Sequence, residues 1–157
     1  MKRKIQFVAL VTMLFFTSII GTSFINTPKA HAYSFSTAWS ITQESYKYIG
    51  VKYIHGGKTP SAFDCSGFVY YLFNKHGVSL PRQSAVDYYW KGKFIYKWNL
   101  VAGDLVFFSV NTPKQVNHIG IYLGNGKFIS ALPANGVTIT SMNSPYWSSR
   151  YMGAKRI

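Results

Sequence analysis

The sequence predicts an α+β domain, because apolar residues recur at helical spacing early in the chain and form short β-branched and aromatic runs later. These later runs are separated by Gly124-Asn125-Gly126 and Asn135-Gly136, which are typical of hairpin turns. A content of 12 Phe, 12 Tyr and 4 Trp among 157 residues favours a packed globule over a disordered chain. The single cysteine cannot form an internal disulfide, so the fold must depend on its apolar core.

The first 32 residues have the pattern of a secretory signal peptide. Residues 2–4 are basic, Ile5–Phe24 is apolar, and Ala30-His31-Ala32 places small residues at the positions that a signal peptidase recognises. An uncleaved membrane anchor is the alternative, since about 20 apolar residues can span a bilayer. We predict cleavage after residue 32, which leaves one domain at 33–157 with no stable membrane anchor, located in the cell wall or extracellular space.

Two helices are expected at the start of this domain. Ser36 or Thr37 caps the first helix and Gly50 ends it, and its apolar residues recur on one face: Trp39, Tyr46 and Ile49. The second helix runs from Asp64 to Gly77, and its apolar residues form two rows: Phe68 with Leu72, and Val69 with Phe73. Four strands then form an antiparallel meander: Leu105–Phe108, Ile119–Leu123, Phe128–Ala131 and Val137–Thr140.

The only cysteine, Cys65, falls in the first turn of the second predicted helix, with Asp64 as the N-cap. The free N–H groups and the positive end of the helix dipole are expected to lower the pKa of this thiol and favour the nucleophilic thiolate. The same N–H groups could hold a developing oxyanion, and Gly67 leaves room for a substrate. The alternative is a buried cysteine with a purely structural role.

A cysteine nucleophile needs a base, and His118 is the best-placed histidine because it begins a predicted core strand. His76 lies at the far end of the helix that Cys65 starts, about 16 Å away at 1.5 Å per residue, which is too far. His55 lies in a glycine-rich loop and stays possible. Each of these histidines could instead be an ordinary surface or core residue.

Six blocks of sequence together resemble the NlpC-type cysteine peptidases of bacterial cell walls: Tyr53–Gly57, Asp64–Phe68, Leu80–Ser84, Gly103–Phe108, His118–Gly124 and Arg150-Tyr151. They occur in the family's order and span about Trp39 to Ile157. The resemblance implies a papain-like fold, with the catalytic cysteine at a helix N-terminus packed on an antiparallel sheet. It also implies hydrolysis of peptidoglycan stem peptides, usually between D-γ-glutamate and a diamino acid such as diaminopimelate.

By the same resemblance, Cys65 is the nucleophile and His118 is the base. Tyr53 matches a tyrosine beside the family's active site, and Ser66 and Arg82 match residues near its substrate cleft, with oxyanion or substrate-binding roles. No cofactor is implied, and no metal site is expected because the four histidines and four acidic residues lack ligand spacing.

The third catalytic position of the family, twelve residues after the base, is occupied here by Ser130 instead of a second histidine. A hydroxyl orients an imidazole less strongly, and we expect Ser130→Ala to cost on the order of 1 kcal/mol. Ser130 shares a face with His118 only if its strand pairs Gly120 with Ser130. The sequence therefore predicts a three-residue loop at 124–126 or an equivalent bulge.

Residues 33–157 contain 13 Lys and Arg against 4 Asp and Glu, a formal charge of +9. Outside a cell, such a domain can meet wall polymers, a membrane surface or nucleic acid, but its scattered basic residues lack the run of a nucleic-acid arm. The charge can also simply keep a surface soluble. Two further functions stay open: a wall amidase or acyltransferase with the same Cys–His pair, and a non-catalytic module that binds anionic wall polymers.

Overall fold

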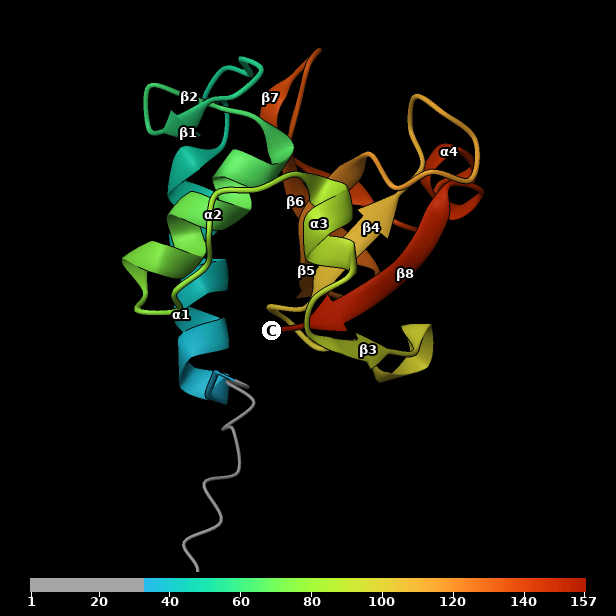
Figure 1. Cartoon of the computed structure of the whole chain (residues 1–157), viewed down its shortest axis with the longest axis horizontal. Coiled ribbons are helices and arrows are strands. Elements are labelled where there is room, and N and C mark those ends of the chain that lie inside the picture. Colours follow the sequence, from blue (N-terminus) through green and yellow to red (C-terminus); the bar gives the residue numbers. More distant parts are fainter. Residues whose placement is uncertain (1–32) are drawn as a thin grey trace, which may run out of the picture.

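A computed structural model describes residues 33–157, and the predicted signal peptide lies outside the described residues. Helices α1 (Phe35–Ser45) and α2 (Cys65–Lys75) pack together, and α2 lies against one face of a six-stranded antiparallel sheet (Figure 1). Within the described part of the chain, no helix combines the length and apolar character required to cross a membrane.

The first predicted helix is present, but its cap and its buried face were predicted wrongly. Ser34 is the N-cap, and its Oγ accepts a hydrogen bond from the backbone N–H of Thr37 at 3.2 Å. The predicted apolar face is exposed, and the helix buries other residues instead, most of them small: Ala38, Ile41, Thr42, Glu44 and Ser45. Close packing explains the difference, because a Cβ added at Gly103 would lie 2.8 Å from the Cβ of Ala38. A 3₁₀ turn, η1 (Tyr46–Tyr48), continues the helix, and Gly50 ends it at φ +86° as predicted.

Helix α2 has the predicted boundaries. Asp64 caps it through the backbone N–H of Gly67, and Gly77 follows the last turn at φ +77°. Both predicted apolar rows are buried in the core. A Cβ added at Gly67 would lie 1.9 Å from the carbonyl oxygen of Gly57, so the helix can approach the preceding loop this closely only with glycine here.

The sheet has the order β3-β8-β4-β5-β6-β7. The predicted meander is confirmed as β4 (Leu105–Phe108), β5 (His118–Gly124), β6 (Lys127–Leu132) and β7 (Gly136–Ser141). The sequence analysis did not find the remaining elements, most of which have five residues or fewer: β1 (Lys58–Thr59), β2 (Ala62–Phe63), α3 (Ala85–Tyr89), β3 (Lys93–Ile95), η2 (Lys97–Asn99), α4 (Pro145–Ser148) and β8 (Tyr151–Arg156).

Two apolar clusters cover the two faces of the sheet. Leu105 and Phe107 of β4 belong to the cluster shared with α2, whereas Val106 and Phe108 belong to a second cluster that Trp147 of α4 completes. All four β4 residues are buried, which explains their uninterrupted apolar run. The centre of the sheet is therefore fixed from both sides, and β5, the next strand, carries His118 on this rigid support.

Candidate active site

Cys65 is the first residue of α2 and lies partly buried in a cleft of about 310 Å³. Its lining comes from the loop before α2, the helix start, the start of α3 and the loop before β5. The lining residues are Tyr53, His55, Asp64, Cys65, Ser66, Ser84, Ala85, Val86, Asn111, Val116 and Asn117. The cleft therefore presents the only thiol of the chain to a ligand.

Burial raises the pKa of the Cys65 thiol to about 11, and the negative charge of Asp64 acts in the same direction. Hydrogen bonds from the backbone at Ile119, Ser66 and Cys65 itself lower this pKa but do not outweigh burial. The prediction that the helix N-terminus lowers the thiol pKa is therefore wrong in its net sign. The helix amides act as expected, but the sequence could not show that the capping carboxylate and the desolvated site oppose them.

His118 begins β5 directly after the cleft residue Asn117, and its imidazole is buried. Its ring packs beside two aromatic side chains, with centroids 5.4 Å from Trp147 and 6.3 Å from Phe108. The Nε2 atom lies 3.0 Å from Ser130 Oγ, so Nδ1 is the ring nitrogen left for a thiol. Burial lowers the pKa of His118 to about 4, which keeps the imidazole neutral and able to accept a proton at neutral pH.

Ser130 reaches His118 through the shape of the β5–β6 hairpin. Asn125 and Gly126, at φ 51° and 67°, form a two-residue turn that pairs Gly124 with Lys127. A register shift between Tyr122 and Gly124 then brings Ile121 opposite Ile129. The three-residue loop is therefore replaced by the equivalent bulge, and the predicted common face of His118 and Ser130 is confirmed by their hydrogen bond.

Asp64 holds together the segments that surround Cys65. Its carboxylate accepts hydrogen bonds from the backbone N–H of Gly67 at 2.6 Å, from the N–H of Gly56 at 2.8 Å and from Ser66 Oγ at 3.0 Å. Arg82 forms an ion pair with the same carboxylate and donates to Ser66 Oγ at 2.8 Å. Ser66 lines the cleft, whereas Arg82 lies behind it and braces the helix start.

Tyr53, which matches a tyrosine beside the family's active site, lines the cleft with Cys65. Its backbone bridges to Phe63, which ties the Tyr53 segment to β2 just before the helix. Burial raises the pKa of Tyr53, and the charges of Cys65 and Asp64 raise it further. Its hydroxyl therefore keeps its proton at neutral pH and can donate a hydrogen bond into the cleft.

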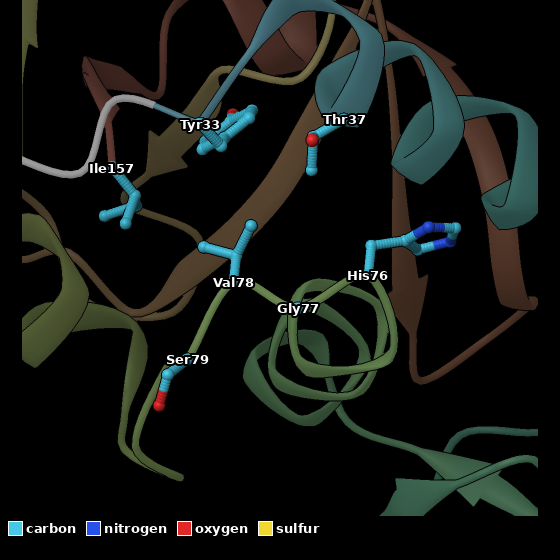
Figure 2. A pocket seen from close by; sticks show the side chains of 7 residues that line it. All are labelled: Tyr33, Thr37, His76, Gly77, Val78, Ser79 and Ile157. Atoms are coloured by element: carbon cyan, nitrogen blue, oxygen red, sulfur yellow. The ribbon is translucent and has the colours of Figure 1, made fainter.

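The two other histidines differ in position. His55 lines the cleft, whereas His76 caps the far end of α2 and faces a separate cavity with Tyr33, Val78 and Ile157 (Figure 2). The exclusion of His76 as a partner of Cys65 agrees with this placement. Among residues 33–157, no group of three or more His, Cys, Asp or Glu side chains is arranged to hold a metal ion.

Sequence analysis missed Asn117, which lines the cleft together with Cys65. Its Oδ1 accepts a hydrogen bond from the backbone N–H of Val110 at 2.7 Å, and its own N–H donates to the carbonyl of Phe108. These bonds close the loop between β4 and β5 and fix the chain just before His118. An asparagine directly before the predicted base was the available signal, because its side chain often closes such loops.

Comparison with known proteins agrees with this arrangement. The model of the NlpC/P60 family matches residues 50–156. The chain is 43% identical over 118 residues to the γ-DL-glutamyl hydrolase of Bacillus subtilis (strain 168), covering 74% of this chain and 28% of that protein. It is 44% identical over 109 residues to the murein DD-endopeptidase MepS/murein LD-carboxypeptidase of Escherichia coli (strain K12), covering 69% and 56%.

Solved structures support the same assignment. An NlpC/P60 family protein from Bacillus cereus ATCC 10987 aligns with a TM-score of 0.70 at 32% identity, over 76% of this chain and 39% of that one. The chain spans between about a quarter and about half of the length of the two curated relatives. The predicted α+β fold is confirmed by this likeness, and the chain belongs to the NlpC/P60 family.

Proposed function

We propose that this protein is a cysteine endopeptidase that cleaves stem-peptide bonds of peptidoglycan. The observation that supports it best is the constellation at the cleft: Cys65 at the start of α2, packed against β5, and His118 on β5 with its Nε2 bound to Ser130. Names of relatives agree with this activity, since one is called a γ-DL-glutamyl hydrolase and another a murein endopeptidase.

The first chemical step joins Cys65 Sγ to the carbonyl carbon of the scissile amide. As the bond forms, the thiol proton passes to Nδ1 of His118, and the Nε2–H of the resulting imidazolium is held by Ser130 Oγ. Both groups start neutral, because burial raises the thiol pKa and lowers the imidazole pKa. Charge therefore develops as the bond forms, which makes its stabilisation in the transition state the decisive contribution.

The oxyanion is stabilised by donors at the helix start. Asp64 already accepts hydrogen bonds from the N–H groups of Gly67 and Phe68, whereas those of Cys65 and Ser66 are directed at the sulfur. These two amides and the Tyr53 hydroxyl are the donors we assign to the oxyanion. The imidazolium then protonates the departing amine, and water activated by His118 hydrolyses the thioester to release the acid product and the free thiol.

The bond that we propose is the one between D-γ-glutamate and a diamino acid, with diaminopimelate as the expected diamino acid. Support comes from the sequence blocks around Cys65 and His118 and from the relative called a γ-DL-glutamyl hydrolase. A second relative is named for DD- and LD-bonds, so relatives of comparable identity cut different linkages. The bond must therefore be measured for this chain.

Digestion of purified peptidoglycan, followed by mass analysis of the fragments, tests the proposal. The protein should release fragments that end in D-γ-glutamate, and Cys65→Ala should release none. A control variant, Ser45→Ala, removes a fully buried hydroxyl in α1, away from the cleft, and should keep activity. Release of intact stem peptides from the glycan would indicate an amidase, amide exchange without hydrolysis an acyltransferase, and no products at all a non-catalytic module.

We further propose that residues 1–32 direct export and are removed, so that residues 33–157 act as the catalytic domain in the wall or outside the cell. The basic start, the apolar run and the Ala30-His31-Ala32 site support this proposal. N-terminal sequencing of protein collected from the culture medium and wall should give Tyr33 as the first residue. A cell-associated protein that retains Met1 would show that the segment is an anchor.

A further inference from the structure

A row of large aromatic side chains lies exposed at the edge of the sheet, outside the catalytic cleft. We call Trp90, Phe94, Tyr96 and Trp98 the aromatic strip; their exposed fractions are 77%, 48%, 54% and 78%. The segment begins after α3, follows β3 and ends in η2. Exposed apolar residues in isolation are ordinary, but several in one continuous segment mark an interaction surface.

The rings of the aromatic strip hold one another in place. Phe94 and Tyr96 meet edge to face with centroids 5.1 Å apart, and Tyr96 and Trp98 are stacked 4.7 Å apart with an angle of 11° between their planes. Trp90 packs at 5.3 Å against Tyr89. The rings of such a cluster lose little freedom on binding, and the outer face of Trp98 stays open to a ligand.

Lysines flank these rings along the sheet edge, with Lys93 and Lys97 on the face of β3 opposite Phe94 and Tyr96. Lys91, Lys93 and Lys97 alternate with the aromatic residues along the chain, and Lys155 of β8 lies 5.7 Å from the centre of the Phe94 ring. None of these four lysines forms an ion pair among the described residues. The sequence between Asp87 and Asp104 contains no acidic residue. The edge of the sheet is therefore positive as well as aromatic.

The aromatic strip is separate from the catalytic machinery. β3 forms one edge of the sheet, and β8 and β4 lie between it and β5, a distance of about 14 Å at 4.8 Å per strand. None of its residues lines the cleft. In Figure 1, β3 lies on the other side of the molecule from β1 and β2, the elements that precede Cys65.

We propose that the aromatic strip binds an anionic sugar-phosphate polymer of the cell wall. Flat aromatic faces suit the apolar faces of sugar rings, and ammonium groups along the same edge, none of them in an ion pair among the described residues, suit phosphate. The charge of +9 on residues 33–157 adds a long-range attraction to the same polyanion. A second copy of the chain is a poorer partner, because the lysines beside the two aromatic strips would repel each other.

This surface goes beyond the proposed hydrolase function, since it would hold the enzyme on the wall without touching the scissile bond. The test measures sedimentation with purified wall that retains its phosphate polymer, using Cys65→Ala chains so that the wall stays intact. Adding Trp90→Ala with Trp98→Ala should weaken binding about tenfold, which corresponds to about 1.4 kcal/mol. Adding Lys93→Gln with Lys97→Gln should weaken it severalfold at low salt, with the difference shrinking as salt rises.

Matched controls come from the same chain. Trp39→Ala and Lys58→Gln alter an exposed tryptophan and an exposed lysine outside the strip, and should leave wall binding unchanged. Chains that keep Cys65 and carry the two tryptophan or the two lysine substitutions should hydrolyse a small soluble stem peptide at the wild-type rate. The peptide assay tests the hydrolase proposal and the sedimentation assay tests the wall-polymer proposal. Either proposal can therefore fail while the other holds.

Three results would overturn the wall-polymer assignment. The first is equal sedimentation of strip and control variants. The second is undiminished binding to wall from which hydrofluoric acid has removed the phosphate polymer, which would indicate an uncharged glycan instead. The third is a concentration-dependent dimer, observed by analytical ultracentrifugation and abolished by Trp98→Ala, which would identify the strip as a contact between two copies of the chain.

Discussion

Replacing Ser130 by alanine tests how His118, the proposed base, is oriented. The Ser130 hydroxyl is fully buried and lies 3.0 Å from Nε2 of His118, which is itself buried beside Trp147 and Phe108. No other hydrogen bond to this nitrogen is present within residues 33–157. Alanine at position 130 therefore leaves a buried N–H without an acceptor at the moment when the imidazole becomes charged.

The expected loss follows from that burial. A hydrogen bond to a charged group contributes about 1.5–3 kcal/mol, more than the value of about 1 kcal/mol for a neutral pair that the sequence alone supported. If the loss falls on the transition state, kcat decreases about 10- to 150-fold. KM should change little, because Ser130 does not line the cleft.

Steady-state kinetics on a soluble stem peptide measure both parameters, and thermal unfolding of each variant checks the fold. Ser45→Ala is the matched control, because it removes an equally buried hydroxyl that donates to the carbonyl of Thr42 at 2.6 Å in α1. This control should lower stability without lowering kcat. A Ser130→Ala variant with wild-type kcat, or one as inactive as Cys65→Ala, would refute the assignment of Ser130 as the positioning residue.

Three further predictions rest on the same structure. Activity should stay level from about pH 5 to pH 10 and fall as His118 is protonated near pH 4. The rate at which iodoacetamide alkylates Cys65 should rise with pH, with a midpoint above pH 8.5, the reference pKa of a free thiol. A midpoint below pH 8.5 would show that a charged His118 imidazolium stabilises the thiolate. Gly67→Ala should lower stability by roughly 1–3 kcal/mol in thermal melts, because its Cβ would meet the Gly57 carbonyl, whereas an unconstrained helix glycine would gain about 1 kcal/mol. Hydrogen bonds from two lysines lower the pKa of Glu44 to about 2, so its stabilising effect is complete above pH 4.5 and is lost as pH falls towards 2. The urea unfolding midpoint of Glu44→Gln should therefore be lower than that of wild type at pH 7 but similar at pH 2. Equal midpoints at pH 7 would contradict this prediction.

Local signals predicted the parts of the fold that short segments determine. Asp64 and Gly77 bounded α2 because a cap and a left-handed stop act within one turn, and the β4 run was found because both of its faces are buried. β3 and β8 escaped prediction, since neither alternates cleanly and their pairing joins residues about 60 positions apart, such as Ile95 and Ala154. Helix α1 was misread because Trp39 has a large apolar ring that its crowded inner face cannot accommodate.

The features of the candidate site were likewise predicted where local signals exist and missed where they depend on distant contacts. Cys65 and His118 were proposed from their positions on predicted elements and from the family resemblance, and the twelve-residue spacing correctly required a bulge to bring Ser130 to His118. The ion pair between Asp64 and Arg82 spans 18 positions and leaves no local pattern. The net pKa of the thiol depends on burial by the whole fold, which no single segment encodes.

The Asp64 carboxylate, which binds the segments around Cys65, also affects how readily the Cys65 thiol is oxidised. Oxidants attack thiolates far faster than protonated thiols, so a sulfur whose pKa lies near 11 resists conversion to sulfenic and higher acids. Asp64 contributes to that high pKa while it also caps α2 and holds Arg82. In an oxidising environment, a chain with one cysteine has no partner thiol to form an internal disulfide that would reverse such damage. The high pKa thus protects the resting thiol, and under the proposed mechanism Cys65 loses its proton to His118 only as its sulfur bonds to a substrate carbonyl.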